Sequence, residues 1–356
     1  MTARVVHVAS GREWRGGQRQ VWLLARELAR AGVDQVVVTG SGTELGERLA
    51  GDGVRVRAVP WTAGLDPRAL PGLLAELRAA PGVVHAHDAH AVTLGGLAAR
   101  LIGRPLVATR RVDFHLRRPG FWARADRVIA ISRAVADVLA ADGIAPERIV
   151  VVHSGIALED LRRTPRLGVR ERLGLEPGAT VAANVAALVG HKDHATLFRA
   201  ASRLADRFPA LHWVVAGEGP ERRPLERLRR DLALEGRVHL LGHIANPAGL
   251  VADANVFVMS SREEGLGTAV LDAMALGIPV ASTTAGGLPE MLQDGAGVLA
   301  PPQDPERLAG AVARLLAEPG LAHAVSERAS VAVQHFTSAR MAEAVRSVYR
   351  SCCPFH

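Results

Sequence analysis

The stretch Ser260-Ser-Arg-Glu-Glu-Gly-Leu-Gly-Thr-Ala-Val-Leu-Asp-Ala-Met-Ala-Leu-Gly-Ile-Pro-Val280 follows the apolar run Asn255–Met259. The apolar run predicts a buried strand, and the first two glycines of the stretch predict a loop after it. A helical pattern then runs to Gly277, with a proline two residues beyond. Strand, loop, helix and a further apolar run are the repeating unit of a parallel sheet.

The same alternation extends outward over the whole chain. Continuous apolar runs separated by helical patterns indicate parallel sheets covered by helices on both faces, which defines the doubly wound α/β class. The expected strands are Val5–Ala9, Val36–Thr39, Val54–Val59, Val83–His87, Leu106–Thr109, Val128–Ile131, Val150–Val152, Val181–Ala186, Leu211–Ala216, Val238–Leu241, Asn255–Met259 and Ile278–Ser282. The expected helices include Gln18–Ala31, Pro67–Ala80, Ala91–Ile102, Thr268–Leu276, Pro305–Ala317, Ala322–Val333, Ser338–Arg350 and two that Ser132 and Asn246 cap.

Periodicity is lost over His153–Arg166, which is the best candidate for a linker. We therefore expect two Rossmann-like domains, 1–162 and 163–335, and a final helix within 336–356 that returns to the first domain. Two such domains place the expected site in the cleft between them, at the carboxyl ends of both sheets.

Composition narrows the class of protein. The chain has 356 residues, of which 48% are hydrophobic and 22% charged, which excludes disordered, collagen-like and coiled-coil proteins. No apolar run reaches the roughly 18 residues of a membrane helix, and the first run is too short for a signal peptide, so we expect a cytoplasmic protein. The only cysteines, Cys352 and Cys353, are adjacent at the end of the chain and build neither a disulfide framework nor a zinc site.

The basic residues are 42 arginines and one lysine, Lys192. Their excess over acidic residues is +6 in residues 1–162 and +1 in the remainder. Such a surplus favours an anionic partner, such as a phosphorylated glycan or a phospholipid, although a solvated basic surface is the commoner explanation. Aromatic residues make up 4% of the chain, so there are few platforms for stacking single-stranded nucleic acid.

Two carboxylates stand in the quoted stretch. Glu264 lies in the loop and Asp272 lies one turn into the helix, with seven residues between them. The free N–H groups at the start of that helix favour an anion, and the glycines allow close approach of the backbone. The pattern predicts a cradle for a phosphate or a sugar, whose hydroxyls the carboxylates could hold. Taken singly, Glu264 is more often just an exposed loop acid, and Asp272 just a first-turn acid favoured by the helix dipole.

Together with Ala285-Gly-Gly-Leu-Pro-Glu290, the stretch resembles the Glu-x7-Glu region of retaining GT-B-fold glycosyltransferases of the family 4 type. Further matching segments follow in the expected order and cover nearly the whole chain: Gly16-Gly17, Val83-Val-His-Ala-His87, Ala125-Asp-Arg-Val-Ile-Ala-Ile-Ser132, Ser154-Gly-Ile and Gly217-Glu-Gly-Pro220. The resemblance implies a GT-B architecture with an N-terminal acceptor-binding domain and a C-terminal domain that binds a nucleotide sugar.

The resemblance also assigns roles to individual residues. Glu264 would contact the transferred sugar, and Asp272, shorter by one methylene than the usual glutamate, would bind the nucleotide ribose. Lys192, in Leu188-Val-Gly-His-Lys-Asp-His194, would neutralise the departing diphosphate. The expected donor-binding residues are Gly16, Gly17, Gly217, Arg262, Gly265, Leu266, Gly267, Thr268 and Asp272.

One position departs from the family pattern. The family usually carries an arginine five residues before the lysine, where this chain has Ala187. We hypothesise that Arg262 or His191 supplies the missing positive charge.

Two histidines of the segment His85-Ala-His87 share one side of an expected strand, which superficially suggests a metal site. Their spacing is not that of the common histidine-rich hydrolases, and we expect no metal. The resemblance instead places His87 beside the donor sugar, as a third catalytic residue, and leaves His85 as a structural residue.

Arg110 and Arg111 follow the next expected strand, where related enzymes often carry a histidine. Adjacent arginines at this edge could bind an anionic acceptor, or could be a solvated pair with Asp113. Arg117, Arg118, Phe121 and Trp122 follow as a basic and aromatic group. That group is compatible with an anionic membrane surface or with packing onto the domain.

The sequence thus predicts a retaining hexosyltransferase that needs no cofactor or divalent metal. It would use a nucleoside diphosphate sugar and a glycan or glycolipid acceptor in lipopolysaccharide or cell-envelope synthesis, at the inner face of the cytoplasmic membrane. The alternatives are a nucleotide-sugar 2-epimerase and a catalytically silent sugar-binding partner of another transferase. Nucleic acid, suggested only by the net charge of +7, is not an expected partner.

Overall fold

The computed structural model describes residues 4–352 and divides into two compact units. The first unit runs to Ala157 and resumes at Thr337, and the second unit is Leu158–Phe336. The sequence-based boundaries at 162 and 335 differ from these by five residues and one residue. The first difference arises because the expected linker contains helix α6 (Leu158–Arg162), which packs on α11 of the second unit. Cys353 lies outside the described residues.

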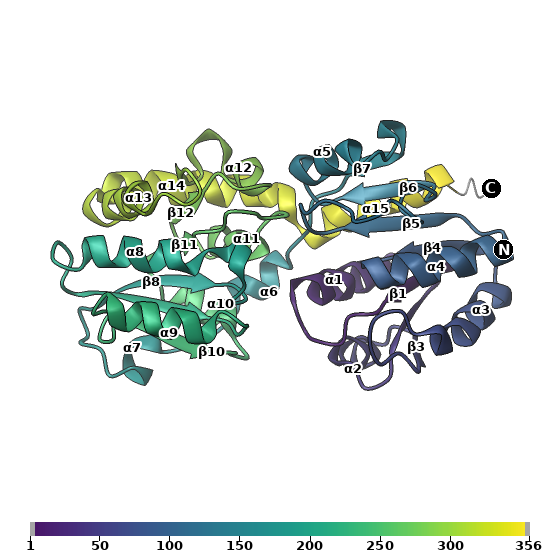
Figure 1. Cartoon of the computed structure of the whole chain (residues 1–356), viewed down its shortest axis with the longest axis horizontal. Helices are drawn as coiled ribbons and strands as arrows, with labels where there is room; N and C mark the ends of the chain where they lie inside the picture. Colours follow the sequence, from purple (N-terminus) through teal and green to yellow (C-terminus); the bar gives the residue numbers. More distant parts are fainter. Residues whose placement is uncertain (1–3, 353–356) are drawn as a thin grey trace. The chain divides into compact units, whose positions relative to one another are not determined.

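The first unit contains one parallel sheet of seven strands in the order β3-β2-β1-β4-β5-β6-β7 (Figure 1). Its strands are β1 (Arg4–Ala9), β2 (Gln35–Gly40), β3 (Val56–Val59), β4 (Gly82–Ala86), β5 (Leu106–Arg110), β6 (Arg127–Ala130) and β7 (Ile149–Val151). The chain winds outward from β1 to β3 and then returns to β4 on the other side of β1. The topological switch point of this sheet therefore lies between β1 and β4.

Helices cover both faces of this sheet, as the continuous apolar strands predict. They are α1 (Gly16–Arg30), α2 (Glu44–Gly51), α3 (Leu70–Ala79), α4 (Ala89–Ile102), α5 (Arg133–Ala141) and α15 (Ser338–Cys352), with short 3₁₀ turns η1 (Pro67–Ala69) and η2 (Pro146–Arg148). Helices α1 and α15 bury Leu24, Met341 and Val345 against Val107 and Ile129 of the sheet.

The return of the chain to the first unit is fixed at Ile156. This residue forms a parallel bridge with Thr337, and its carbonyl accepts a hydrogen bond from Ser338 N at 2.8 Å. A Cβ on Gly155 would lie 2.7 Å from Ser338 Cα, so the two chain segments approach closely only because residue 155 is glycine. From here α15 runs along β5 and β6 of the first sheet (Figure 1).

The second unit contains a parallel sheet of six strands in the order β10-β9-β8-β11-β12-β13. The strands are β8 (Thr180–Val185), β9 (Leu211–Ala216), β10 (Val238–Gly242), β11 (Val256–Met259), β12 (Val280–Thr283) and β13 (Val298–Ala300). By the same reasoning as above, its switch point lies between β8 and β11.

The second unit also has helices on both faces of its sheet. Besides α6 they are α7 (Val169–Arg172), α8 (His194–Leu204), α9 (Arg222–Asp231), α10 (Pro247–Ala252), α11 (Thr268–Ala275), α12 (Leu288–Met291), α13 (Pro305–Ala317) and α14 (Pro319–Ala332), with 3₁₀ turns η3 (Gly190–Lys192), η4 (Gln293–Gly295) and η5 (Val333–Phe336). Phe198, Trp213 and Val312 belong to one buried cluster that joins α8 and α13 to the sheet.

The predicted α/β fold is confirmed, and the missed elements, which include α2, α6, α7, α12 and β13, are short. Helix α2 has only two buried leucines, Leu45 and Leu49, and strand β13 is three residues long at the sheet edge, so neither leaves a strong pattern. The predicted caps Ser132 and Asn246 accept hydrogen bonds from Val135 N and Gly249 N. Within residues 4–352, no helix is long and apolar enough to cross a membrane.

Candidate functional site

The loops at the switch point of the second unit are joined by hydrogen bonds to main-chain carbonyls. Turn η3 follows β8, and the loop of the quoted stretch follows the neighbouring β11. Ser260 Oγ donates to Lys192 O at 2.9 Å, and Arg262 N donates to His191 O at 2.9 Å. Asp193, in the left-handed region with φ 47°, ends the turn and caps α8 through Thr196 N. These contacts fix the backbone on both sides of Lys192.

Lys192 and Glu264, 72 residues apart, form an ion pair. Their side chains are 16% and 9% exposed, so the pair is largely removed from water. Ser261 Oγ donates to the same Glu264 oxygen at 3.2 Å, and Gly287 N donates to the Glu264 carbonyl at 2.9 Å. The structure thus brings together the two residues that the sequence singled out, and it adds two supporting residues.

Helix α11 begins beside this pair in the sequence, and its N-terminus carries no acidic residue and no side-chain cap. The preceding Gly267 has φ 91°, and a Cβ there would lie 2.7 Å from Leu288 Cδ2 and 3.4 Å from Glu264 Cγ. Only glycine therefore fits between the glutamate and α12. Gly265 and Leu266 are buried, and Thr268 is half-buried.

Asp272 is buried in the second turn of α11, with 6% of its surface exposed. An acid at this depth gains little from the helix dipole, which acts over the first turn. Interaction with the helix dipole therefore does not explain why an acidic residue stands at position 272.

The loop after β9 approaches the end of β8 closely. Gly217 has φ 152°, and a Cβ there would lie 1.9 Å from Ala186 O. Gly217 N donates to Gly242 O at 2.8 Å, and Leu188 N donates to Glu218 O at 2.9 Å. Three loops of the second unit are thus held together by main-chain contacts.

Arg262 is exposed, and its guanidinium lies 3.7 Å from the position of a Cβ on Gly190. It therefore packs over the turn that carries Lys192. Ala187 is half-buried and lies just after the end of β8, before this turn.

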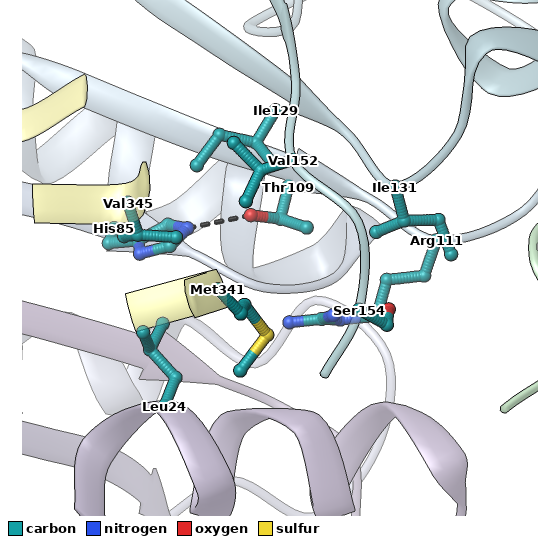
Figure 2. A pocket seen from close by; sticks show the side chains of 10 residues that line it. All are labelled: Leu24, His85, Thr109, Arg111, Ile129, Ile131, Val152, Ser154, Met341 and Val345. Carbon is teal, nitrogen blue, oxygen red and sulfur yellow. Dashed lines mark hydrogen bonds between the residues drawn. The ribbon is translucent and has the colours of Figure 1, made fainter. Parts of the chain in front are cut away.

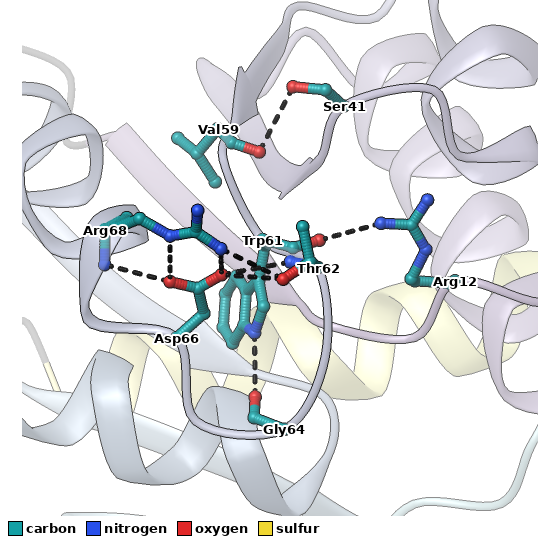
Figure 3. A network of polar contacts seen from close by, with 8 residues as sticks. All are labelled: Arg12, Ser41, Val59, Trp61, Thr62, Gly64, Asp66 and Arg68. Carbon is teal, nitrogen blue, oxygen red and sulfur yellow. Dashed lines mark hydrogen bonds and ion pairs between the residues drawn. The ribbon is translucent and has the colours of Figure 1, made fainter.

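In the first unit, Asp88 joins the two strands at the switch point. Its carboxylate accepts hydrogen bonds from Ser10 N at 2.7 Å and from Ser10 Oγ, and it caps α4 through Ala91 N. The loop after β1 is also tied to the loop after β3, because Arg12 Nη1 donates to Trp61 O at 3.2 Å (Figure 3). Within the second loop, Asp66 accepts from Thr62 N and from the Arg68 guanidinium, and Trp61 Nε1 donates to Gly64 O. Hydrogen bonds within the chain therefore connect the loops on this edge.

His87 belongs to a buried chain of hydrogen bonds. Arg111 Nη2 lies 3.2 Å from His87 Nδ1, and His87 Nε2 lies 2.9 Å from His7 Nδ1. Because a guanidinium only donates, His87 Nδ1 accepts and its proton resides on Nε2, which donates to His7. Burial lowers the pKa of His87 well below its usual value, and the neighbouring His85, His7 and Arg111 lower it further. We expected His87 to contact a sugar, but both its ring nitrogens have protein partners.

The three histidines His7, His85 and His87 place ligand atoms within 4.8 Å of one another. His85 is bound on both sides, with Tyr349 Oη at 2.6 Å and Thr109 Oγ1 at 2.7 Å. Of the six ring nitrogens, only His7 Nε2 lacks a hydrogen bond within the described chain. In this arrangement a bound dication would have to replace these hydrogen bonds and would meet the like charge of the adjacent guanidinium, and the expected absence of a metal stays a prediction.

Arg111 lies at the switch point of the first unit. Its Cδ lies 3.6 Å from the position of a Cβ on Gly17, over the first turn of α1, which begins at Gly16. Burial lowers its pKa to about 10, with the charge of Asp88 opposing that effect, so it stays protonated at neutral pH. Its Nε and Ser154 Oγ are buried and have no hydrogen-bond partner among residues 4–352, and both residues line a cavity of about 10 Å³ (Figure 2).

Arg110, by contrast, makes its contacts with the loop after β5. Its Nη2 donates to Phe114 O at 2.5 Å, and its Cζ lies 5.6 Å from the Trp122 ring centroid. Burial lowers its pKa, while Asp142 and Asp113 oppose that effect. The two arginines that the sequence paired thus have separate surroundings.

Several supporting residues were missed by sequence reasoning. Ser260 and Ser261 stand directly after a buried strand, and that position could have identified them. His7 and Tyr349 carried no such signal, because they reach the site residues from β1 and α15 through the fold.

A doubly wound sheet with charged and glycine-rich loops at its switch point defines a class of nucleotide- and phosphate-binding proteins. Comparison with known families narrows the class. Residues 168–331 match the model for glycosyl transferases group 1, and residues 14–160 match the model for glycosyltransferase family 4.

Individual relatives agree. The chain is 34% identical over 345 residues to D-inositol 3-phosphate glycosyltransferase 1 of Catenulispora acidiphila, covering 84% of this chain and 81% of that protein. It is 31% identical to D-inositol 3-phosphate glycosyltransferase of Actinosynnema mirum, covering 91% and 89%. Anabaena HepE, solved with UDP-glucose, has a TM-score of 0.87 at 20% identity, covering 98% of this chain and 99% of that one. The chain therefore belongs to the GT-B glycosyltransferases of the family 4 type.

Proposed function

We propose that this glycosyltransferase moves a hexose-type sugar from a nucleoside diphosphate sugar to the hydroxyl of a glycan or glycolipid, with retention of the anomeric configuration. The observation that carries the proposal is the Lys192–Glu264 pair at the switch point of the second unit, at the start of α11. The names of the relatives, and the UDP-glucose bound to Anabaena HepE, support the choice of substrate class.

In the proposed reaction, the bond from the anomeric carbon to the diphosphate oxygen breaks and a bond to the acceptor oxygen forms on the same face. The acceptor proton passes to the leaving diphosphate. Lys192 and the N–H groups at the start of α11 stabilise the developing negative charge, while Glu264 orients the sugar hydroxyls and Asp272 holds the ribose. Because the ammonium supplies the charge, we propose that no divalent cation is needed.

Arg262 is the better of the two candidates for a second cation on the leaving group. Its guanidinium is exposed and packs over the turn that carries Lys192, whereas His191 is half-buried within that turn. Arg262→Ala should lower the turnover rate, and an unchanged rate would remove this residue from the proposal.

We propose that the acceptor carries an anionic group that binds Arg111. This arginine is charged, is held in place by His87, and lies over the first turn of α1. The anionic acceptors that fit the basic first half of the chain are phosphorylated glycans and glycolipids of the cell envelope, including lipopolysaccharide, presented at the membrane surface.

The test is release of nucleotide from UDP-, GDP- and ADP-sugars by the purified protein, with and without an extract of envelope glycolipids, in buffer and in EDTA. Acceptor-dependent release from one donor, unchanged by EDTA, is expected. Turnover that ignores acceptor would indicate a 2-epimerase or a hydrolase instead. Tight nucleotide binding without turnover across a broad panel of acceptors would indicate a silent sugar-binding partner.

A further inference from the structure

Helix α4 carries two exposed leucines beside its packed face. Ala91, Leu94 and Ala98 are buried, and a Cβ on Gly95 would contact Val84, Val8 and Ala86 of the sheet. Next to this face, Leu97 is 37% and Leu101 is 60% exposed, one turn apart. Two exposed leucines on one helical turn form an apolar ridge that the described residues leave uncovered.

The loop after β5 packs beside this ridge. A Cβ on Gly96, next to Leu97, would lie 2.6 Å from the Phe121 ring, so the ring rests directly on the helix backbone. At its other end the loop is fixed by Asp142, which accepts from Leu116 N at 2.6 Å and pairs with His115 at 2.7 Å. Residues 117–120 between these two anchors are all exposed. The tip of the loop is thus exposed to solvent, while contacts with α4 and with Asp142 hold its two ends.

The exposed charged side chains within residues 89–124 are all arginines. Residues 89–124 contain seven arginines and a single carboxylate, Asp113. Asp113 is half-buried and its charge acts on Arg110. The exposed arginines are Arg100, on the turn that joins the two leucines, and Arg117, Arg118 and Arg124 in the loop. Arg124 lies over the Phe121 ring at 5.8 Å, so the basic and apolar groups are interleaved.

We propose that the α4 ridge and the 114–124 loop form a docking surface for an anionic lipid bilayer, with Leu97 and Leu101 entering the headgroup boundary and the arginines contacting lipid phosphates. Apolar side chains alone would suit a protein partner equally well. Four exposed arginines with no exposed carboxylate among residues 89–124 favour a surface of uniform negative charge. The proposal deepens the proposed function, since it rests on an acceptor presented at a membrane.

The experiment is co-sedimentation of the full chain with vesicles of phosphatidylcholine alone or with 30 mol% phosphatidylglycerol, a composition chosen to be roughly as anionic as a bacterial inner membrane. Binding to the anionic vesicles that is lost in 0.5 M NaCl, a salt level at which the screening length is only about 4 Å, is expected. Arg117→Gln with Arg118→Gln should weaken it by about 30-fold, from roughly a fivefold contribution per arginine. Leu97→Gln with Leu101→Gln should weaken it by about tenfold or more.

The matched control is Arg223→Gln with Arg227→Gln on α9, which removes the same charge from exposed positions of the second unit and should change binding less than about twofold. Equal binding to neutral vesicles, or equal loss in the control, would overturn the proposal. So would binding to an envelope protein that persists without lipid. Lipid binding is measured without turnover, so an inactive protein that binds refutes only the proposed function, and an active one that does not bind refutes only this surface.

Discussion

The two sheets place opposite electrostatic arrangements at their switch points. In the second unit, the cation Lys192 is directly paired with the carboxylate of Glu264. In the first unit, Arg111 contacts the neutral ring of His87, and Asp88 acts on it only through space. A paired cation can exchange its partner for a substrate anion, whereas a cation held by neutral groups keeps its attraction for a new anion. The paired Lys192 of the second unit suits a step in which charge develops. Arg111 of the first unit, held by a neutral ring, suits binding of a permanent anion.

The largest expected effect is on the pair itself. Lys192→Met should lower the free energy of unfolding by about 3 kcal/mol, because it leaves a largely buried carboxylate without its cation. Adding Glu264→Gln should restore most of the loss without restoring activity. Urea unfolding of the single and double variants measures both effects, and additive losses would show that the two residues are not coupled.

Acid should destabilise the first unit before the second. Burial lowers the pKa of His7 to about 4 and those of His85 and His87 well below 6.5. The unfolded chain therefore binds more protons between pH 6.5 and about 4, so stability is present above that window and is lost as the pH falls through it. His7 alone accounts for about 3 kcal/mol.

The second unit has two histidines whose pKa is lowered to about 4: His194, by burial and by nearby Lys192 and His191, and His239, by burial and by nearby His212 and Arg229. Hydrogen exchange at pH 7 and pH 5 should show earlier loss of protection in β1, β4 and α15. Simultaneous loss in both units would contradict this order.

The glycines of the two units should respond differently to a methyl group. Gly217→Ala should cost about 2 kcal/mol and weaken nucleotide binding, since the Cβ would meet Ala186 O at 1.9 Å in a conformation with φ 152°. Gly17→Ala should be nearly neutral for folding, because its nearest neighbour would be Arg111 Cδ at 3.6 Å. Thermal unfolding of the two variants tests the contrast, and similar midpoints would show that the loop after β9 can relax.

The smallest expected effect separates the two arginines. Arg111→Gln should raise the acceptor KM by about tenfold with little change in the donor KM, because a charge-assisted contact is lost. Arg110→Gln should lower the melting temperature more than it changes the acceptor KM, since Arg110 supports Phe114 and Trp122. Equal changes in KM would mean that both arginines reach the acceptor.

Sequence reasoning predicted the elements in which the apolar period and the residues at the ends indicate the same secondary structure. The strand from Leu211 to Ala216 and the helix from Pro305 to Ala317 have the predicted bounds, since each has a clear apolar period and a clear start. It also selected Lys192 and Glu264, because the rarity of lysine and the resemblance to a family marked them.

It could not predict that Tyr349 and Thr109 would hold His85, or that His7 would occupy one side of His87. Those contacts join β1, β4, β5 and α15, and long-range packing leaves no periodic trace in the sequence. The same limit explains why Arg110 and Arg111 were treated as one group.

The central claim is that Lys192 and Glu264 carry the transfer chemistry, and the turnover number of Glu264→Gln tests it most directly. With donor and acceptor both saturating, we expect the turnover number to fall by at least about 100-fold while the dissociation constant for the nucleotide changes less than about threefold. A turnover number within about threefold of the wild type, in a protein of unchanged fold, would contradict the account.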